Sequence, residues 1–323
     1  MMASGGASAL VAGRDGAPAL VLLGAPRCGT TSLAKWLGDA GLGVGVKDSF
    51  YLMDDDAGLR GSTHVSGDGV DGYLNLFRGQ PDPAVEVTAG YLYQQRALAF
   101  FASWRVPPQF AVILRDPIER LESVHQYFTG NLMKLPSDLT FDDYISQLFD
   151  HRIGLPDQTV SNALVQGRYA EALDPWAERF GKERIRILRF EDIKAHPAEV
   201  VTDIVSALGQ TSAVDLRNYH FASRNQSYSP RNRAVKIVSM AGRHLVPRGR
   251  IRSAGGELWR RLQVGRGAAP QQHRVASEAV ERVRAYYVGP NHDLAHRYGI
   301  DVSGWTTGAP APGQPDAPNS STG

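Results

Sequence analysis

The feature that most constrains this 323-residue chain is one short segment, residues 19–37, which reads ALVLLGAPRCGTTSLAKWL. Its apolar run, Ala19–Leu23, predicts a buried parallel strand. A tight turn with two glycines and a proline follows. A helix is then predicted to begin at Thr30, because Leu33, Trp36 and Leu37 recur at helical spacing. Backbone N–H groups point into such a loop, and the helix N-terminus adds about half a positive charge. The segment therefore predicts a binding site for a phosphate or sulfate group.

The loop departs from the nucleotide-kinase pattern GxxxxGK[ST], in which a lysine directly follows the second glycine. Gly24 and Gly29 have the required spacing, but Thr30 occupies the lysine position and the cation is Arg27, inside the loop. Without that lysine, nucleoside triphosphate hydrolysis lacks one of its usual charge partners, whereas an arginine can still neutralise a phosphate or a developing negative charge. A simple Gly-Pro turn ahead of an ordinary helix is the alternative interpretation.

A second segment, residues 109–128, predicts another buried strand, which ends at Arg115. Asp116 has the position of a helix N-cap, Pro117 suits the first helical residue, and Glu119 completes a start that resembles a capping box. Open α/β sheets bind ligands at the carboxyl ends of their strands, which is where Arg115 lies. Ser123, on the following helix, is away from its apolar stripe. An arginine and a hydroxyl that converge there suit a second phosphate.

Two anion sites without a kinase lysine resemble those of the sulfotransferases that use 3′-phosphoadenosine 5′-phosphosulfate (PAPS). The stretch Pro26–Thr31 is similar to their 5′-phosphosulfate loop, and Arg115–Pro117 with Arg120 and Ser123 is similar to their 3′-phosphate motif. In addition, residues 45–51 and 86–91 are similar to two segments of the heparan-type branch, and weaker likenesses extend the resemblance over residues 18–305.

The resemblance implies an α/β fold: a three-layer domain with a central, mostly parallel sheet, flanking helices and helical insertions. We expect one such domain over residues 18–305, with insertions near the site at 129–180 and 224–266, a flexible N-terminus at 1–17 and a disordered tail at 306–323. The expected strands are Ala19–Gly24, Leu42–Val46, Ala84–Thr88, Phe110–Arg115 and Arg184–Phe190.

The resemblance also implies a mechanism, in-line transfer of a sulfuryl group from PAPS to an acceptor hydroxyl with 3′,5′-ADP as the product. Arg27, Lys47 and the loop N–H groups would stabilise the charge that develops, and Asp48 would be the general base. His125 is the alternative base. The residues implied to bind the donor are Arg27, Cys28, Gly29, Thr30, Thr31, Ser32, Arg115, Ser123 and Arg231.

Three positions depart from the family pattern. Arg27 stands where most members have a lysine, and Val87 replaces the lysine of the Glu-Lys-Ser segment. Asp48 replaces the glutamate that is the base of the heparan-type branch, and its side chain is one methylene shorter. These changes keep open the alternative of a nucleotide-binding homologue without catalytic activity. A P-loop kinase or NTPase is the other alternative.

The composition bears on the partners of the protein. Eleven Lys/Arg and a single acid, Glu257, lie between residues 224 and 266, which predicts either a basic lid over the donor, with Arg231 and Arg233 as candidates, or a solvated surface. No nucleic-acid reading motif accompanies this run, so we expect no nucleic-acid binding. The acceptor is expected to be a small molecule or a carbohydrate, and no metal is expected because no cluster with ligand spacing occurs.

The single cysteine, Cys28, lies in the anion loop. The neighbouring arginine and helix N-terminus are features that lower a thiol pKa, but we interpret Cys28 as a small residue that fills the loop, because sulfuryl transfer needs no thiol. One cysteine forms no internal disulfide, which suits a reducing compartment. We expect no membrane span and no targeting segment, and hence a cytoplasmic protein.

Overall fold

The structure is a computed structural model that describes residues 17–54, 69–222 and 277–306. Nearly all of the predicted N-terminal segment and C-terminal tail, and the whole of the 224–266 insertion, lie outside the described residues. Arg231 and Arg233, the candidates for a basic lid, lie outside them as well. All statements below therefore concern the described ranges.

Five parallel strands form one sheet in the order β2-β3-β1-β4-β5. Every predicted strand is present, with ends that differ by at most two residues from the prediction. The bounds are β1 Pro18–Gly24, β2 Gly43–Val44, β3 Ala84–Val87, β4 Gln109–Leu114 and β5 Ile185–Arg189. The three central strands, β1, β3 and β4, are mostly apolar and buried, as expected of a parallel sheet covered on both faces, whereas the edge strand β5 carries Arg186 and Arg189.

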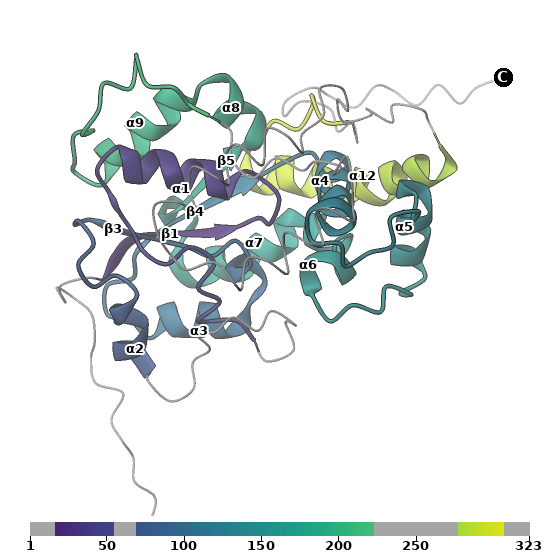
Figure 1. The fold of residues 1–323 in the computed structure, drawn as a ribbon, viewed down its shortest axis with the longest axis horizontal. Helices are drawn as coiled ribbons and strands as arrows, with labels where there is room; N and C mark the ends of the chain where they lie inside the picture. Colours follow the sequence, from purple (N-terminus) through teal and green to yellow (C-terminus); the bar gives the residue numbers. More distant parts are fainter. Residues whose placement is uncertain (1–16, 55–68, 223–276, 307–323) are drawn as a thin grey trace, which may run out of the picture.

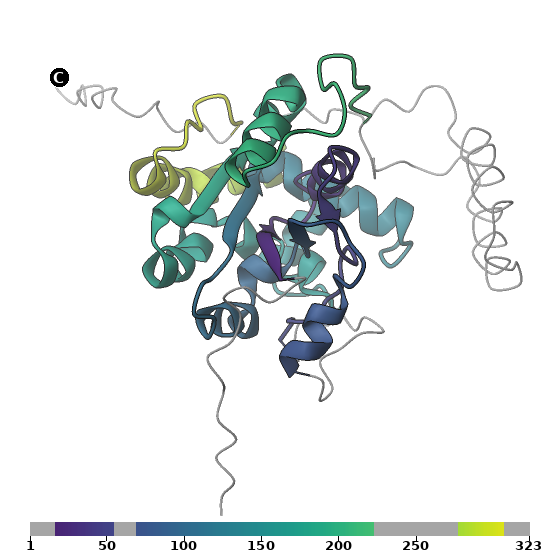
Figure 2. The ribbon, with the colours of Figure 1, turned by 90° about the vertical axis from the view of Figure 1, so that its left-hand side faces the viewer.

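Helices cover both faces of this sheet, which confirms the predicted three-layer α/β fold (Figure 1 and Figure 2). The upper layer in Figure 1 consists of α1 Thr30–Asp39, α8 Phe190–Ala195 and α9 Pro197–Ala207. The other layer consists of α2 Gly69–Asn75, α3 Gln95–Ala102 and α7 Tyr169–Phe180. Short 3₁₀ turns lie at η1 Tyr91–Tyr93, η3 Val165–Gly167 and η4 Lys182–Arg184.

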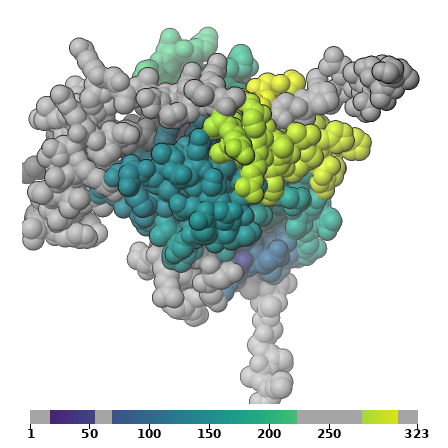
Figure 3. Space-filling model, turned by 90° about the vertical axis from the view of Figure 1, so that its right-hand side faces the viewer, coloured from purple at the N-terminus to yellow at the C-terminus, as the bar shows by residue number. Residues whose placement is uncertain are grey.

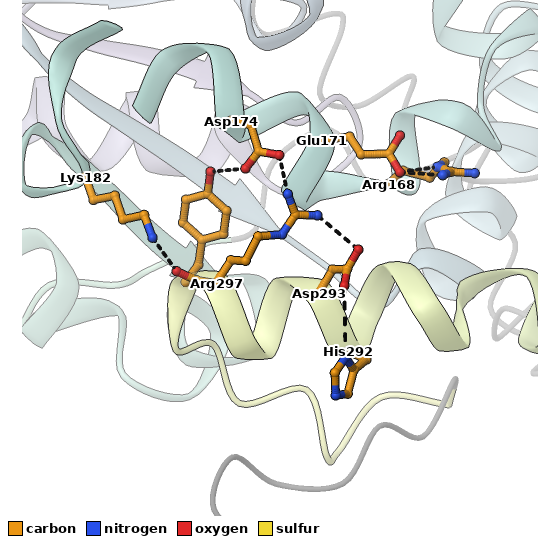
Figure 4. A network of polar contacts seen from close by, with 8 residues as sticks. Arg168, Glu171, Asp174, Lys182, His292, Asp293 and Arg297 are labelled. Atoms are coloured by element: carbon orange, nitrogen blue, oxygen red, sulfur yellow. Dashed lines mark hydrogen bonds and ion pairs between the residues drawn. The ribbon is translucent and has the colours of Figure 1, made fainter. Parts of the chain in front are cut away.

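A second group of helices packs beside the sheet around its own apolar cluster. It comprises α4 Pro117–Gln126, the π-helical turn η2 Tyr127–Asn131, α5 Phe141–Phe149, α6 Gln158–Ser161 and the long α12 Glu278–Tyr298. Figure 3 shows α12, in yellow-green, lying against the teal segment that contains α5. A polar contact joins α12 to α7: the Arg297 guanidinium donates to Asp174 of α7, and it also donates to Asp293 one turn earlier in α12 (Figure 4).

The start of α4 follows its predicted capping, with one difference. Asp116 is the N-cap, and its Oδ1 accepts hydrogen bonds from the backbone N–H groups of Ile118 at 2.8 Å and Glu119 at 3.3 Å. Pro117 is the first helical residue. The predicted capping box does not close, because the Glu119 carboxylate instead accepts two hydrogen bonds from the Arg115 guanidinium.

The strand order brings the two predicted anion sites together. Strands β1 and β4 are direct neighbours, so the loop after β1 and the loop after β4 lie side by side at one edge of the sheet. After β1 the chain crosses to β2 on one side, and after β4 it crosses to β5 on the other. Such a reversal is the switch point at which open α/β sheets bind ligands.

Candidate functional site

The loop between β1 and α1 has the geometry of an anion site. Arg27 and Gly29 both adopt left-handed backbone conformations, with φ of 70° and 95°. Gly29 caps α1 without a side-chain hydrogen bond, and the first turn of the helix has no acidic residue. Among the described residues, the positive end of α1 therefore has no carboxylate cap of its own. Thr30 and Ser32 are buried in this first turn, and Thr31 between them is half-buried.

The Arg27 side chain connects the loop to α4. Its Nε donates a hydrogen bond to Ser123 Oγ at 3.3 Å, and its guanidinium lies over the Tyr127 ring at 4.0 Å from the ring centre. Ser123 and Tyr127 are four residues apart, so they lie on the same side of the helix. Burial lowers the pKa of Arg27, although arginine remains protonated at any pH of interest. These two contacts hold the Arg27 guanidinium between the β1–α1 loop and the C-terminal part of α4.

Arg115 reaches the same place from the end of β4. Its guanidinium lies 4.7 Å from the centre of the Phe190 ring, and Phe190 is the first residue of α8. The same ring packs against the loop, because a Cβ added at Gly29 would lie 3.0 Å from Cε2 of Phe190. One aromatic ring thus touches both predicted anion sites. Glycine suits position 29 for two reasons: its backbone φ is positive, and a side chain there would collide with the Phe190 ring.

The predicted pairing of Arg115 with Ser123 differs from the observed contacts. Ser123 accepts from Arg27, and Arg115 donates to Glu119 Oε2 from Nε at 3.1 Å and from Nη2 at 2.9 Å. Arg115 and Glu119 have the i, i+4 spacing that favours such an ion pair on a helix start. Both arginines thus bond to residues of α4, Arg27 to Ser123 and Arg115 to Glu119.

Lys47 and Asp48 follow β2 and approach the site from its other side. The Lys47 ammonium donates a hydrogen bond to the Asp48 carboxylate. The Asp48 backbone N–H donates to the Val87 carbonyl at 2.8 Å, which fixes the segment to the end of β3. Asp48 interacts electrostatically with Arg27 and with Tyr127. The catalytic residues implied by the resemblance, Arg27, Lys47 and Asp48, thus come together.

Beneath Asp48 lies a buried polar cluster that includes a carboxyl group. Glu86 is fully buried, and its Oε1 accepts hydrogen bonds from Thr88 Oγ1 at 2.6 Å and Ser49 Oγ at 3.4 Å. Ser49 also bonds the Tyr91 hydroxyl at 3.1 Å, which in turn accepts from the Leu52 backbone N–H. Burial raises the pKa of Glu86 to about 7, and Asp48 adds to the rise. This cluster anchors the segment that carries Asp48.

Cys28 is fully buried within the loop, and burial raises the pKa of its thiol to about 11. The effect of desolvation exceeds the opposing effects of Arg120 and Arg115, so the thiol is protonated at neutral pH. The neighbouring cations and the helix N-terminus therefore do not produce a reactive thiolate. The interpretation of Cys28 as a residue that fills the loop agrees with this environment.

His125, the alternative base, has a structural environment. Its Nε2 lies 2.8 Å from the Leu139 carbonyl oxygen, at hydrogen-bond distance, and its ring packs against Phe141 and Tyr144. These contacts tie α4 to the start of α5. The observed packing favours Asp48 over His125 as the side chain available to an acceptor.

Sequence reasoning missed two aromatic residues of the site. Tyr127 covers Arg27, and Phe190 links Gly29 to Arg115. A signal for Tyr127 exists in the sequence, since it follows Ser123 by four residues. A signal for Phe190 is its position directly after β5, beside β4 in the sheet. Within the described ranges, no group of three or more His, Cys, Asp or Glu side chains could hold a metal ion, and no helix is long and apolar enough to cross a bilayer.

Comparison with known proteins identifies the family. The family model described as "Sulfotransferase domain" matches residues 99–281, which is more than half of the chain. The chain belongs to the sulfotransferase domain family. This finding confirms the resemblance inferred from the two anion motifs.

Relatives of this sulfotransferase-family chain include much longer proteins. It is 26% identical over 219 residues to the bifunctional heparan sulfate N-deacetylase/N-sulfotransferase 1 of Mus musculus, a match that covers 64% of this chain and 23% of that protein. The protein of the same name from Caenorhabditis briggsae is 22% identical over 199 residues, which cover 58% of this chain and 22% of that one. The matched region thus spans less than a quarter of these relatives' length.

Among solved structures, a sulfotransferase from Alicyclobacillus acidocaldarius has a similar fold. The two superpose with a TM-score of 0.59 at 16% sequence identity, and the match covers 90% of this chain and 98% of the other. At this identity the likeness concerns the fold alone, and it agrees with the five-stranded parallel sheet described above.

Proposed function

We propose that this protein transfers a sulfuryl group from PAPS to a hydroxyl group of a small-molecule or carbohydrate acceptor. The observation that carries the proposal is the meeting of two cationic sites at one aromatic ring. The loop of Arg27 and the strand end of Arg115 both reach Phe190, on neighbouring strands of a sulfotransferase-family chain. A single donor that carries a 5′-phosphosulfate and a 3′-phosphate on the same ribose fits two neighbouring cationic sites.

The residues of the two sites fit such a donor. The 5′-phosphosulfate would bind in the β1–α1 loop, where the N–H groups of Gly29, Thr30 and Thr31 and the positive end of α1 suit an anion. The side chains of Thr30, Thr31 and Ser32 belong to the same turn, with Cys28 filling the loop beneath. Arg115 and Ser123 would hold the 3′-phosphate, which requires Arg115 to exchange the Glu119 carboxylate for phosphate oxygens. Arg231 would contribute from outside the described residues.

Bound PAPS supplies an activated sulfuryl group, and the protein contributes position, charge and a base. Arg27 and Lys47 would stabilise the negative charge that develops on the oxygen that leaves the sulfur. Asp48 would accept the proton of the acceptor oxygen as that oxygen bonds to sulfur. The ion pair between Lys47 and Asp48 holds both groups on the same short segment, so a small rotation of each side chain would redirect them to donor and acceptor.

The relatives give one further direction for the acceptor. Their names state N-sulfation of heparan sulfate, so the acceptor panel should include amino sugars beside hydroxylated compounds. Asp48 serves either nucleophile, since both an alcohol and an amine lose a proton during transfer.

The test is turnover of labelled PAPS with this panel by the purified chain and by two matched variants. Asp48→Asn should lower kcat about 100-fold or more, the range expected for loss of a general base, with nearly unchanged affinity for 3′,5′-ADP. Asp203→Asn, which alters an exposed aspartate of α9, should match the parent protein. Full activity in the Asp48 variant would remove that residue from the mechanism. Turnover of ATP with magnesium, and none of PAPS, would favour the kinase alternative.

A further inference from the structure

The short segment that carries Asp48 has a strained backbone. Asp48 and Phe50, on either side of Ser49, both adopt left-handed conformations, with φ of 52° and 55°. Aspartate adopts this conformation more readily than most residues, whereas a bulky residue such as phenylalanine adopts it rarely. Such conformations persist only where surrounding contacts hold them. The contacts around Ser49 are therefore the ones to look for.

Strained residues of this kind concentrate at the candidate site. The structure describes five non-glycine residues with positive φ, and three of them are Arg27, Asp48 and Phe50. Arg27 lies in the β1–α1 loop, and Asp48 interacts electrostatically with it. Backbone strain clusters where a fold has to hold a functional group in one direction. The distribution points to Asp48 as a side chain whose direction matters.

Ser49 is the residue that fixes this segment to the sheet. It is 2% exposed, and its hydroxyl oxygen lies 3.1 Å from the Tyr91 hydroxyl. The same oxygen lies 3.4 Å from Glu86 Oε1 of β3 and 3.4 Å from Thr88 Oγ1, just after that strand. The Tyr51 backbone N–H donates to it at 3.3 Å. One short side chain thus bonds β3, the turn that follows β3, and its own segment.

The bonds around Ser49 form a directed chain in which each proton is used once. The Leu52 backbone N–H donates to the Tyr91 oxygen at 3.2 Å, and the Tyr91 hydroxyl can then donate to Ser49. The Ser49 hydroxyl in turn donates to Glu86 Oε1. Because Ser49, Glu86 and Tyr91 are buried, loss of one hydroxyl breaks bonds that water does not readily replace.

Asp48 is held by its backbone and accessible at its carboxylate. Its N–H donates to the Val87 carbonyl at 2.8 Å, and the next residue in the chain is the buried Ser49. The Asp48 side chain is 35% exposed and accepts a hydrogen bond from the Lys47 ammonium. A base that receives a proton from an acceptor molecule needs this combination of a fixed backbone and an accessible carboxylate.

We infer that Ser49 is the positioning residue of the proposed base: its buried hydroxyl holds Asp48 in the left-handed conformation that directs the carboxylate toward Arg27 and the β1–α1 loop. The inference rests on the proposed function, since it gives Ser49 a part in the reaction only through Asp48. With its side chain buried, Ser49 acts through the backbone of its neighbour rather than by contact with donor or acceptor.

The first experiment is a double-variant cycle that measures kcat with PAPS and affinity for 3′,5′-ADP in the full chain. Ser49→Ala should lower kcat about 10-fold, because a small displacement of a reacting group lowers the rate steeply, and leave the affinity within about 2-fold. Added to Asp48→Asn, the same substitution should lower kcat by less than about 2-fold, since the carboxylate that Ser49 positions is already gone. Ser212→Ala removes a half-buried hydroxyl bonded to the Val214 backbone after α9 and should change neither quantity.

The second experiment measures amide hydrogen exchange of the ligand-free chain over residues 47–53, and so is independent of turnover. Exchange there should be about 10-fold faster in Ser49→Ala than in the parent, because the segment opens more often without its anchor. Exchange over β4 should be unchanged, and Ser212→Ala should match the parent in both places.

Full kcat in a folded Ser49→Ala would overturn the inference, and so would unchanged exchange over residues 47–53. Losses that multiply in the double variant would show that Ser49 acts independently of Asp48, which would also overturn it. If Ser49→Ala does not fold, Tyr91→Phe takes its place, because it removes a hydroxyl on the other side of the same bond. Absence of PAPS turnover by the parent would instead contradict the proposed function, and the exchange measurement would still test whether Ser49 fixes the segment.

Discussion

Replacement of Glu86 by glutamine tests whether burial raises the pKa of the carboxyl group beneath Asp48. Glu86 Oε1 accepts from Thr88 and Ser49, and Oε2 has no partner among the described residues. A glutamine can keep the Oε1 contacts with the same shape. It differs from the protonated acid by little, but it cannot lose a proton and become a buried anion.

The size of the effect follows from the pKa of Glu86, raised to about 7 from 4.5 by burial. Between these two values the folded protein binds a proton that the unfolded chain releases. The free energy of unfolding therefore contains a favourable contribution that is full below pH 4.5 and is lost as the pH rises through about 7. For Glu86 the loss between pH 5 and pH 8 amounts to about 2.5 kcal/mol.

The assay is urea unfolding of the parent protein and Glu86→Gln at pH 5, 6, 7 and 8. The variant should gain about 2.5 kcal/mol relative to the parent between pH 5 and pH 8, because only the parent loses this contribution. Other titrating groups are present in both proteins and cancel in the difference. Glu178→Gln, which alters an exposed residue of α7, serves as the control and should show no such trend. A stability difference independent of pH would refute the burial argument.

Three further predictions concern the loop and the strand end. Arg115→Ala should weaken 3′,5′-ADP about 30-fold in titration calorimetry but leave 5′-AMP within about 3-fold, and equal losses would contradict a 3′-phosphate site. Gly29→Ala should lower the melting temperature and donor affinity more than Gly209→Ala, because both glycines have positive φ but only a Cβ at Gly29 meets Phe190 at 3.0 Å; equal effects would exclude that contact. Cys28, the only cysteine, should react with iodoacetamide at pH 8 far more slowly in the folded protein than in urea, whereas equal rates would show an accessible thiolate.

The sequence predicted the sheet and both anion motifs because their signals are local. An apolar run followed by a glycine-bearing turn predicts β1 and α1, and the capping residue Asp116 predicts the start of α4. The carboxyl ends of parallel strands lie at one edge of a sheet, so the sequence also predicts that the two motifs lie close together. The side chain at position 115 also lies where the prediction put it, at the carboxyl end of β4.

The contacts between the motifs depend on side-chain conformations, which no local sequence pattern predicts. Ser123 was expected beside Arg115, but the i, i+4 ion pair with Glu119 occupies that guanidinium and Ser123 accepts from Arg27. The ring of Tyr127 reaches Arg27 from a π-helical turn, whose wider winding is not encoded in apolar spacing. Glu86 lies in the strand Ala84–Val87, where its burial depends on helices packed from elsewhere in the chain.

The central claim is that one nucleotide, anionic at both ends, spans the β1–α1 loop and the end of β4. Titration calorimetry of the purified chain with 3′,5′-ADP, 5′-AMP and ATP with magnesium tests it directly. We expect 3′,5′-ADP to bind about 100-fold more tightly than 5′-AMP, without any need for magnesium, since a second phosphate adds charge-assisted hydrogen bonds at Arg115. Equal affinity for 3′,5′-ADP and 5′-AMP, or a preference for ATP with magnesium, would contradict the account.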